Sequence, residues 1–76
     1  MESYKNLGGD SGVVGYEIGQ TEIKVQFRDR TIYLYTSQSA GPERVEHMKQ
    51  LAEAGRGLNS YINLVVKMAY ASKRRL

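Results

Sequence analysis

The chain contains no cysteine and one histidine. Without cysteine, disulfide bonds and Cys-ligated metal sites are excluded. The single histidine, His47, excludes a metal site built from several histidines of one chain. No stretch approaches the roughly 20 apolar residues of a membrane span, and the N-terminus shows no charged-then-apolar signal pattern. We therefore expect a cytoplasmic protein that holds no metal or cofactor and does not enter a membrane.

Sequence motifs of enzymes are also missing. The chain has neither a phosphate-binding glycine loop nor a dinucleotide-binding fingerprint. Residues 9–12, Gly-Asp-Ser-Gly, are similar to the nucleophile loop of trypsin-like proteases. Acyl transfer, however, needs a base and an orienting acid held by a large scaffold, which 76 residues with one histidine do not supply. We expect no enzymatic activity.

The length of 76 residues allows one small domain, and 41% of the residues are hydrophobic, enough for one core. Glycines at positions 8, 9 and 12 predict a flexible leader over residues 1–12, with little to bury. Residues 13–76 are predicted to form the domain itself.

Residues 13–19, 22–28 and 31–36 show the period-two alternation that is typical of β-strands. The connections at 19–21 and 29–30 are short enough for hairpins, which predicts an antiparallel meander. The alternation assigns one apolar face to Val14, Ile18, Ile23, Val25, Phe27, Ile32 and Leu34. It places Tyr33 and Tyr35 on the opposite face.

Two helices are predicted after the strands. Pro42 suits the first position of a helix, and Gly55 suits its C-terminal end. A second helix is expected from about residue 58 to 72. Its buried side would be formed by Tyr61, Ile62, Val65, Met68 and Ala69. Because the apolar face of a sheet needs a cover, we predict an α+β fold of order β-β-β-α-α, with both helices on one face.

The order of several short motifs resembles a known family. The motifs are Val14-Gly15-Tyr16, the Tyr-x-Tyr of residues 33–35, and Gly55-x-x-Leu58-Asn59-x-x-Ile62. Over residues 13–70 this order resembles the KTSC domain, a module found alone in bacterial and phage-type proteins and at the C-terminus of some lysyl-tRNA synthetases. The chain departs from the family at Leu58, where the family usually has Phe, and at Pro42, which comes later than the family's Val-Pro. The resemblance implies RNA binding, which the family's place on tRNA synthetases suggests. It does not imply enzymatic activity.

The charges are distributed unevenly along the chain. All eight acidic residues lie at or before Glu53, whereas five basic residues and no acid follow it. This asymmetry favours an acidic partner for the C-terminal part, most commonly a nucleic acid. A solvent-exposed basic helix end, favoured by the helix dipole, would also explain it.

Two surfaces are candidates for such a partner. On the sheet face away from the helices, Tyr33 and Tyr35 would stack unpaired bases between Lys24 and Arg28. The last helix would add Lys67 and Arg74 on one stripe, and Arg56 near its start would bind an anion. We predict a module that binds RNA or other single-stranded nucleic acid through Lys24, Arg28, Tyr33, Tyr35, Arg56, Lys67 and Arg74.

Other interpretations fit the same residues. Exposed tyrosines also stabilise sheets through cross-strand pairs, and Tyr33 and Tyr35 could instead pack against the helices. The broad apolar side of residues 61–70 suggests a protein partner or a homodimer as an alternative function. A small phosphorylated ligand is a third candidate.

Overall fold

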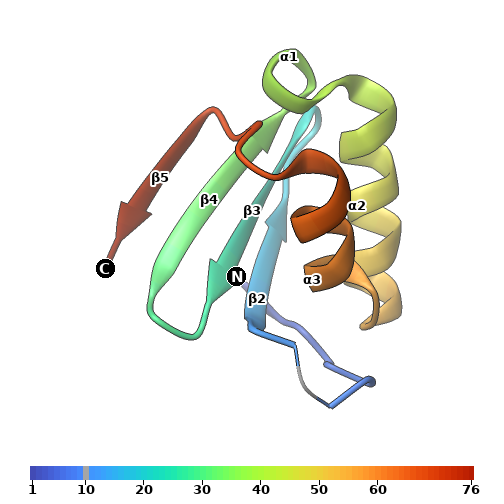
Figure 1. Ribbon diagram of the computed structural model, residues 1–76, viewed down its shortest axis with the longest axis vertical. Helices are drawn as coiled ribbons and strands as arrows, with labels where there is room; N and C mark the ends of the chain where they lie inside the picture. Colours follow the sequence, from blue (N-terminus) through green and yellow to red (C-terminus); the bar gives the residue numbers. More distant parts are fainter. Residues whose placement is uncertain (10) are drawn as a thin grey trace.

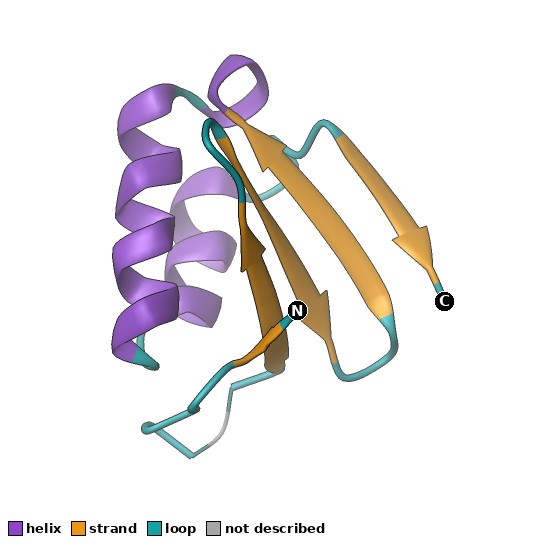
Figure 2. Cartoon of the chain, turned by 180° about the vertical axis from the view of Figure 1, so that it is seen from behind, coloured by secondary structure: helices purple, strands orange, loops and turns teal. Residues whose placement is uncertain are grey.

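A five-stranded antiparallel sheet, with the strands in the order β1-β2-β3-β4-β5, forms one layer of the structure, and the helices cover one face of it (Figures 1 and 2). The strands are β1 (Glu2–Ser3), β2 (Val13–Ile18), β3 (Glu22–Phe27), β4 (Thr31–Thr36) and β5 (Ser72–Arg75). The helices are α1 (Ser37–Ala40), α2 (Pro42–Ala54), α3 (Leu58–Tyr61) and the π-helix η1 (Ile62–Val66). This computed structural model describes residues 1–9 and 11–76, so Asp10 of the predicted leader lies outside the described residues.

The central part of the prediction is confirmed. The chain has an α+β fold, and β2, β3 and β4 form the expected antiparallel meander. Helix α2 begins at Pro42, whose missing N–H costs nothing at a first helical position. It ends at Gly55, which adopts the left-handed conformation with a φ of 79° that glycine accepts without strain.

The N-terminal segment belongs to the folded structure. Strand β1 extends the sheet by pairing with β2, which brings Glu2 opposite Tyr16. The next residue, Tyr4, is 6% exposed, and its hydroxyl oxygen accepts a hydrogen bond from the backbone N–H of Leu58 at 3.3 Å. The prediction that residues 1–12 have little to bury is therefore wrong at Tyr4.

The predicted helix over residues 58–72 is wrong beyond residue 66. The helical segment ends at Val66, because the φ of 43° and ψ of −113° at Lys67 leave the helical region. Residues 72–75 then form β5, which pairs with β4. The pairing of β5 with β4 satisfies the hydrogen-bonding backbone groups along the edge of β4. Helix propensity is a local property and does not report this long-range interaction. Val65 and Met68, predicted to be buried, are exposed.

The turn between β3 and β4 decides which side chains face the helices. The backbone N–H of Arg30 donates to the carbonyl oxygen of Phe27 at 3.0 Å, and Arg30 has a φ of 72°. Residues 28–30 therefore form a three-residue loop closed by a left-handed residue, rather than the predicted two-residue turn at 29–30. The longer loop shifts the register by one residue, which turns every side chain of β4 to the other face.

The observed register puts the two strand tyrosines under the helices. Tyr33 pairs with Val25 and Tyr35 pairs with Ile23, and directly opposed residues of antiparallel strands share a face. Tyr35 is 0% exposed. The prediction that Tyr33 and Tyr35 face away from the helices is wrong. Ile32 and Leu34, predicted to be in the core, lie with Lys24 on the opposite face.

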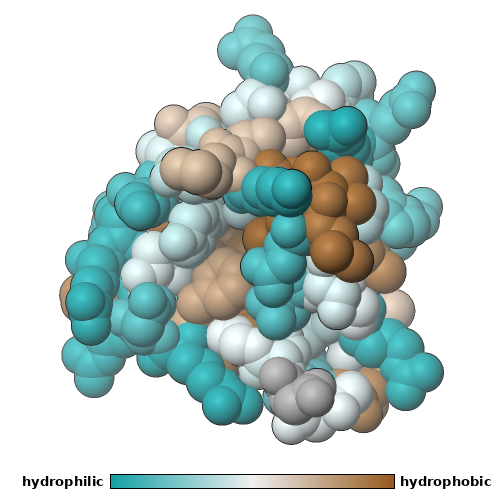
Figure 3. Space-filling view, viewed as in Figure 1, coloured by the Kyte–Doolittle hydropathy of each residue, from teal (hydrophilic) through white to brown (hydrophobic). Residues whose placement is uncertain are grey.

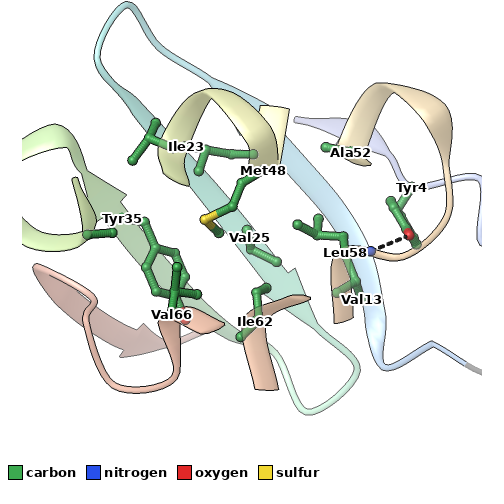
Figure 4. Packing of buried hydrophobic residues seen from close by; sticks show 12 residues of the cluster. Tyr4, Val13, Ile23, Val25, Tyr35, Met48, Ala52, Leu58, Ile62 and Val66 are labelled. Atoms are coloured by element: carbon green, nitrogen blue, oxygen red, sulfur yellow. Dashed lines mark hydrogen bonds between the residues drawn. The ribbon is translucent and has the colours of Figure 1, made fainter. Parts of the chain in front are cut away.

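The core lies between β2–β4 and the helices, and Figure 4 shows its side chains converging from both layers. A register irregularity between Val13 and Gly15 buries Val13 and leaves Val14 exposed, so the predicted role of Val14 passes to its neighbour. The largest fully buried side chains are those of Tyr35, Ile23, Met48, Leu58, Val13, Val25, Val45 and Val66. None of the helices in residues 1–9 and 11–76 is long and apolar enough to cross a membrane.

Candidate functional site

The helices cover the β2–β3 side of the sheet more fully than the β4–β5 side (Figure 1). A groove of about 390 Å³ lies where this cover ends, between strands β4 and β5 and the segment that contains η1. We call it the aromatic groove, because four rings line it: Phe27, Tyr33, Tyr35 and Tyr70. Its remaining lining side chains include Asn63, Lys67, Lys73 and Asp29. The site therefore combines an apolar wall with charged groups.

Tyr33 stands at the centre of the aromatic cluster. Its ring lies 5.0 Å from that of Tyr70 and 5.3 Å from that of Phe27, both in edge-to-face geometry. It also stacks on the Tyr35 ring at 6.4 Å. Tyr33 and Tyr70 are half-buried, so parts of both rings remain accessible from the groove. Such pairs hold the rings in fixed orientations, which suits a surface that receives a planar ligand.

Tyr35 lies beneath this cluster and connects the sheet to the end of η1. Its hydroxyl donates to the backbone carbonyl oxygen of Lys67, at 3.3 Å. Burial, with a smaller contribution from the neighbouring Tyr33 and Tyr70, raises the pKa of Tyr35 to about 12. The hydroxyl therefore stays protonated, and able to donate, at any physiological pH.

Two lysines supply positive charge to the aromatic groove. The Lys73 ammonium lies 5.7 Å from the ring centroid of Tyr70 and 6.0 Å from that of Tyr33, within the range of cation–π attraction. Its position follows from the pairing of Lys73 with Tyr33 across β4 and β5. Lys67 reaches the groove from the end of η1. Among the described residues, neither lysine forms a salt bridge.

Asp29 adds an acidic group at the edge of the same groove. Its carboxylate accepts a hydrogen bond from the backbone N–H of Thr31 at 3.0 Å. Hydrogen bonds from Thr31, together with the charge of Arg75, lower the pKa of Asp29. The carboxylate is therefore ionised at neutral pH, where it opposes part of the lysine charge.

The structure brings three of the seven predicted site residues together. Tyr33, Tyr35 and Lys67 all line the aromatic groove. They come from β4 and from the end of η1, and the grouping depends on the register that turns both tyrosines toward the helices.

The other four predicted residues lie elsewhere. Lys24 and Arg74 line a separate pocket on the opposite face of the sheet, where Lys24 forms a 3.8 Å salt bridge with Glu17. Arg28 is exposed just after β3 and does not line the groove. Arg56 lines another pocket, beside Tyr4. A single surface made from Tyr33, Tyr35, Lys24 and Arg28 is therefore wrong.

Sequence reasoning missed Phe27, Tyr70 and Lys73 as members of one site. Phe27 was expected in the core, Tyr70 fell within the predicted last helix, and Lys73 entered only the charge count. The β4–β5 pairing is what sets Lys73 beside Tyr33. The run Ser-Lys-Arg-Arg has no apolar alternation that would have marked it as a strand.

An exposed apolar patch borders the aromatic groove. Leu64 and Met68 are 76% and 79% exposed, and Val65 is exposed beside them. Figure 3, drawn from the same side as Figure 1, shows hydrophobic side chains gathered over the helical segment that contains α3 and η1. We call Leu64, Val65 and Met68 the apolar patch; Met68 also lines the groove.

The charged and aromatic groups of the groove suit binding of an anionic, partly aromatic ligand. Within the part of the chain that the structure describes, no group of three or more His, Cys, Asp or Glu side chains could hold a metal ion. No family model, no curated protein and no solved structure matches the chain. The resemblance to the KTSC domain thus stays a prediction.

Proposed function

We propose that the protein is a non-enzymatic module that binds single-stranded nucleic acid, RNA in particular, in the aromatic groove. The observation that carries the proposal is the position of Lys73 over the rings of Tyr33 and Tyr70. Unpaired bases pack on accessible aromatic rings, and ammonium groups beside them neutralise the phosphates. The resemblance to the KTSC domain, with its occurrence on tRNA synthetases, supports RNA over DNA.

The distribution of charge favours the aromatic groove over the opposite face of the sheet. Lys67 and Lys73 make no salt bridge among the described residues, whereas Lys24 is paired with Glu17. The pocket on the opposite face is lined by Ile32 and Leu34, which offer no ring for stacking. Of these two surfaces, only the groove therefore offers a phosphate chain both aromatic rings and lysines that form no salt bridge among the described residues.

The test is a pair of charge-matched double variants. Lys67→Glu with Lys73→Glu reverses the groove, and Lys24→Glu with Arg74→Glu changes the net charge equally on the opposite face. Binding of a short fluorescent RNA of mixed sequence is measured by anisotropy at about 50 and about 200 mM salt. We expect the groove variant to lose at least about tenfold in affinity and to show a shallower salt dependence, while the control loses far less. Equal losses in both variants would contradict a site in the groove.

The aromatic wall is tested separately, with Tyr70→Ala. Base–aromatic stacking contributes about 1–3 kcal/mol per base, so the loss should be about fivefold or greater and should persist at high salt. Tyr16→Ala, which removes a half-buried tyrosine that does not line the groove, is the control. The same oligonucleotide as DNA measures the preference for RNA. If no salt-dependent complex forms with either strand, the proposal is wrong.

The apolar patch supports a second candidate function, a homodimer or a protein-interaction module. Leu64 and Met68 expose most of their side chains, and exposed apolar groups of this kind mark interfaces. Sedimentation equilibrium of the wild type and of a Leu64→Asp, Met68→Asp variant tests self-association. A dimer that the double substitution dissociates would support this function, and a monomer at high concentration would remove the homodimer.

A further inference from the structure

Lys67 has a backbone conformation that lysine rarely adopts. Its φ of 43° with a ψ of −113° lies outside the left-handed helical region and is a conformation in which a Cβ atom is strained. Such residues persist only where their surroundings hold them, and they cluster at ligand-binding sites. The π-helix, a form frequently found at functional sites, ends at Val66, directly before this residue.

Two hydrogen bonds hold the Lys67 backbone in place. Its N–H donates to the carbonyl oxygen of Ile62 at 2.6 Å, and its carbonyl oxygen accepts from the Tyr35 hydroxyl at 3.3 Å. Tyr35 itself is fully buried and stacks on Tyr33, so this second bond ties Lys67 to the rigid part of the sheet. The strained residue is thereby fixed from both its helical and its sheet side.

The strain coincides with the position of a groove cation. The Lys67 side chain is exposed and lines the aromatic groove together with Lys73. A glycine at position 67 would adopt this backbone conformation without strain but would supply no ammonium. A lysine in this strained conformation lowers the stability of the fold. Its presence is explained if the ammonium is needed at this position for function.

We propose that Lys67 is a phosphate-binding residue of the aromatic groove, held ready for the ligand by its strained backbone, and that Tyr35 is a positioning residue that acts through it. This inference rests on the proposed binding of nucleic acid. The fixed backbone at Lys67 sets the direction of its Cα–Cβ bond. Less conformational entropy is therefore lost when the ammonium binds a phosphate. Tyr35 contributes to binding without contacting the ligand.

Strain is tested by thermal unfolding of Lys67→Gly and Lys67→Ala. Both variants lack the ammonium, but glycine alone relieves the backbone. We expect the glycine variant to melt about 4–8 °C above the alanine variant, the reverse of their order in an ordinary helix. If the melting temperature of the glycine variant is equal to or below that of the alanine variant, the backbone at position 67 is not strained.

Positioning is tested by a double-mutant cycle on affinity for the same short RNA. Lys67→Ala should weaken binding about tenfold, as expected for one charge-assisted contact. Tyr35→Phe, which removes only the hydroxyl, should weaken it about threefold in the wild type but leave it unchanged in the Lys67→Ala background. Equal effects of Tyr35→Phe in both backgrounds would overturn the positioning role, and an unchanged affinity of Lys67→Ala would overturn the phosphate contact.

The outcomes separate this inference from the proposed function. If Lys73→Glu weakens RNA binding while the cycle shows no coupling, the groove binds RNA and the role given to Lys67 and Tyr35 is wrong. If the wild type binds no RNA, both proposals fall together. Circular dichroism of each variant confirms that the fold is intact, because Tyr35 belongs to the core.

Discussion

One face of the sheet has two different parts. Beneath α2, the side chains of Ile23 and Val25 on β3 are fully buried against the helix and close the core. On β4 and β5 the same face carries Tyr33 and Lys73, which border an open groove. The first part uses aliphatic groups that only exclude water, and the second uses rings and an ammonium that can also contact a ligand. Under the proposed function, β3 serves stability and the neighbouring β4 and β5 serve binding, with Tyr35 at the boundary.

The largest expected difference between the two parts is in stability. Met48 of the core is 0% exposed, and Met48→Ala should lower the free energy of unfolding by about 2–5 kcal/mol, because it removes buried contacts and leaves a cavity. Met68→Ala makes the same chemical change at the groove, where the side chain is largely exposed, and should change stability by less than about 0.5 kcal/mol. Urea denaturation measures both values. Similar losses would show that the groove edge is part of the core.

A smaller effect is expected where the N-terminal segment joins the covered part. Tyr4→Phe removes the hydroxyl that accepts the Leu58 N–H and leaves that buried donor without a partner. The expected cost is about 1–3 kcal/mol in urea denaturation. Tyr16→Phe, on a half-buried tyrosine, is the control and should cost much less. RNA affinity should not change in either variant, since neither tyrosine lines the aromatic groove.

A further effect, absent at neutral pH, is confined to alkaline pH and concerns Tyr35. Burial raises the pKa of Tyr35 from its ordinary value of 10.0 to about 12. Between these values the unfolded chain loses the phenol proton while the folded protein keeps it, so the stability from this group is complete below pH 10 and is lost as pH rises toward 12. Denaturant titrations over this range should show a steeper decline for the wild type than for Tyr35→Phe. Parallel declines would mean that Tyr35 is more accessible than its position indicates.

Local patterns predicted the central elements of the fold because those patterns have local causes. The three strands of the meander, the start of α2 at Pro42 and its end at Gly55 depend on alternation, a missing N–H and a left-handed glycine. Strands β1 and β5 were missed because they are short edge strands that form only when a partner strand is present. Their sequences contain little apolar alternation to mark them.

The candidate site could not be predicted for a related reason. Its composition depends on one extra residue in the loop at 28–30, which sets the register of β4. Hydrophobicity predicted that Ile32 and Leu34 face the core. In the structure, Tyr33 and Tyr35 face the helices instead. Alternation reports that two faces differ, but not which face the helices will cover. Of the residues predicted for binding, only Tyr33, Tyr35 and Lys67 therefore lie in the groove, and finding Lys73 required the position of β5.

The row of cations along β5 has a consequence for self-association. Beyond this strand the sheet has an open edge, whose free backbone groups could pair with a strand of another molecule. Lys73, Arg74 and Arg75 repel the same edge of a second copy, and so act as gatekeepers against edge-to-edge aggregation. Polyanions that screen these charges remove that protection, so turbidity should rise first in mixtures where polyanion charge balances protein charge.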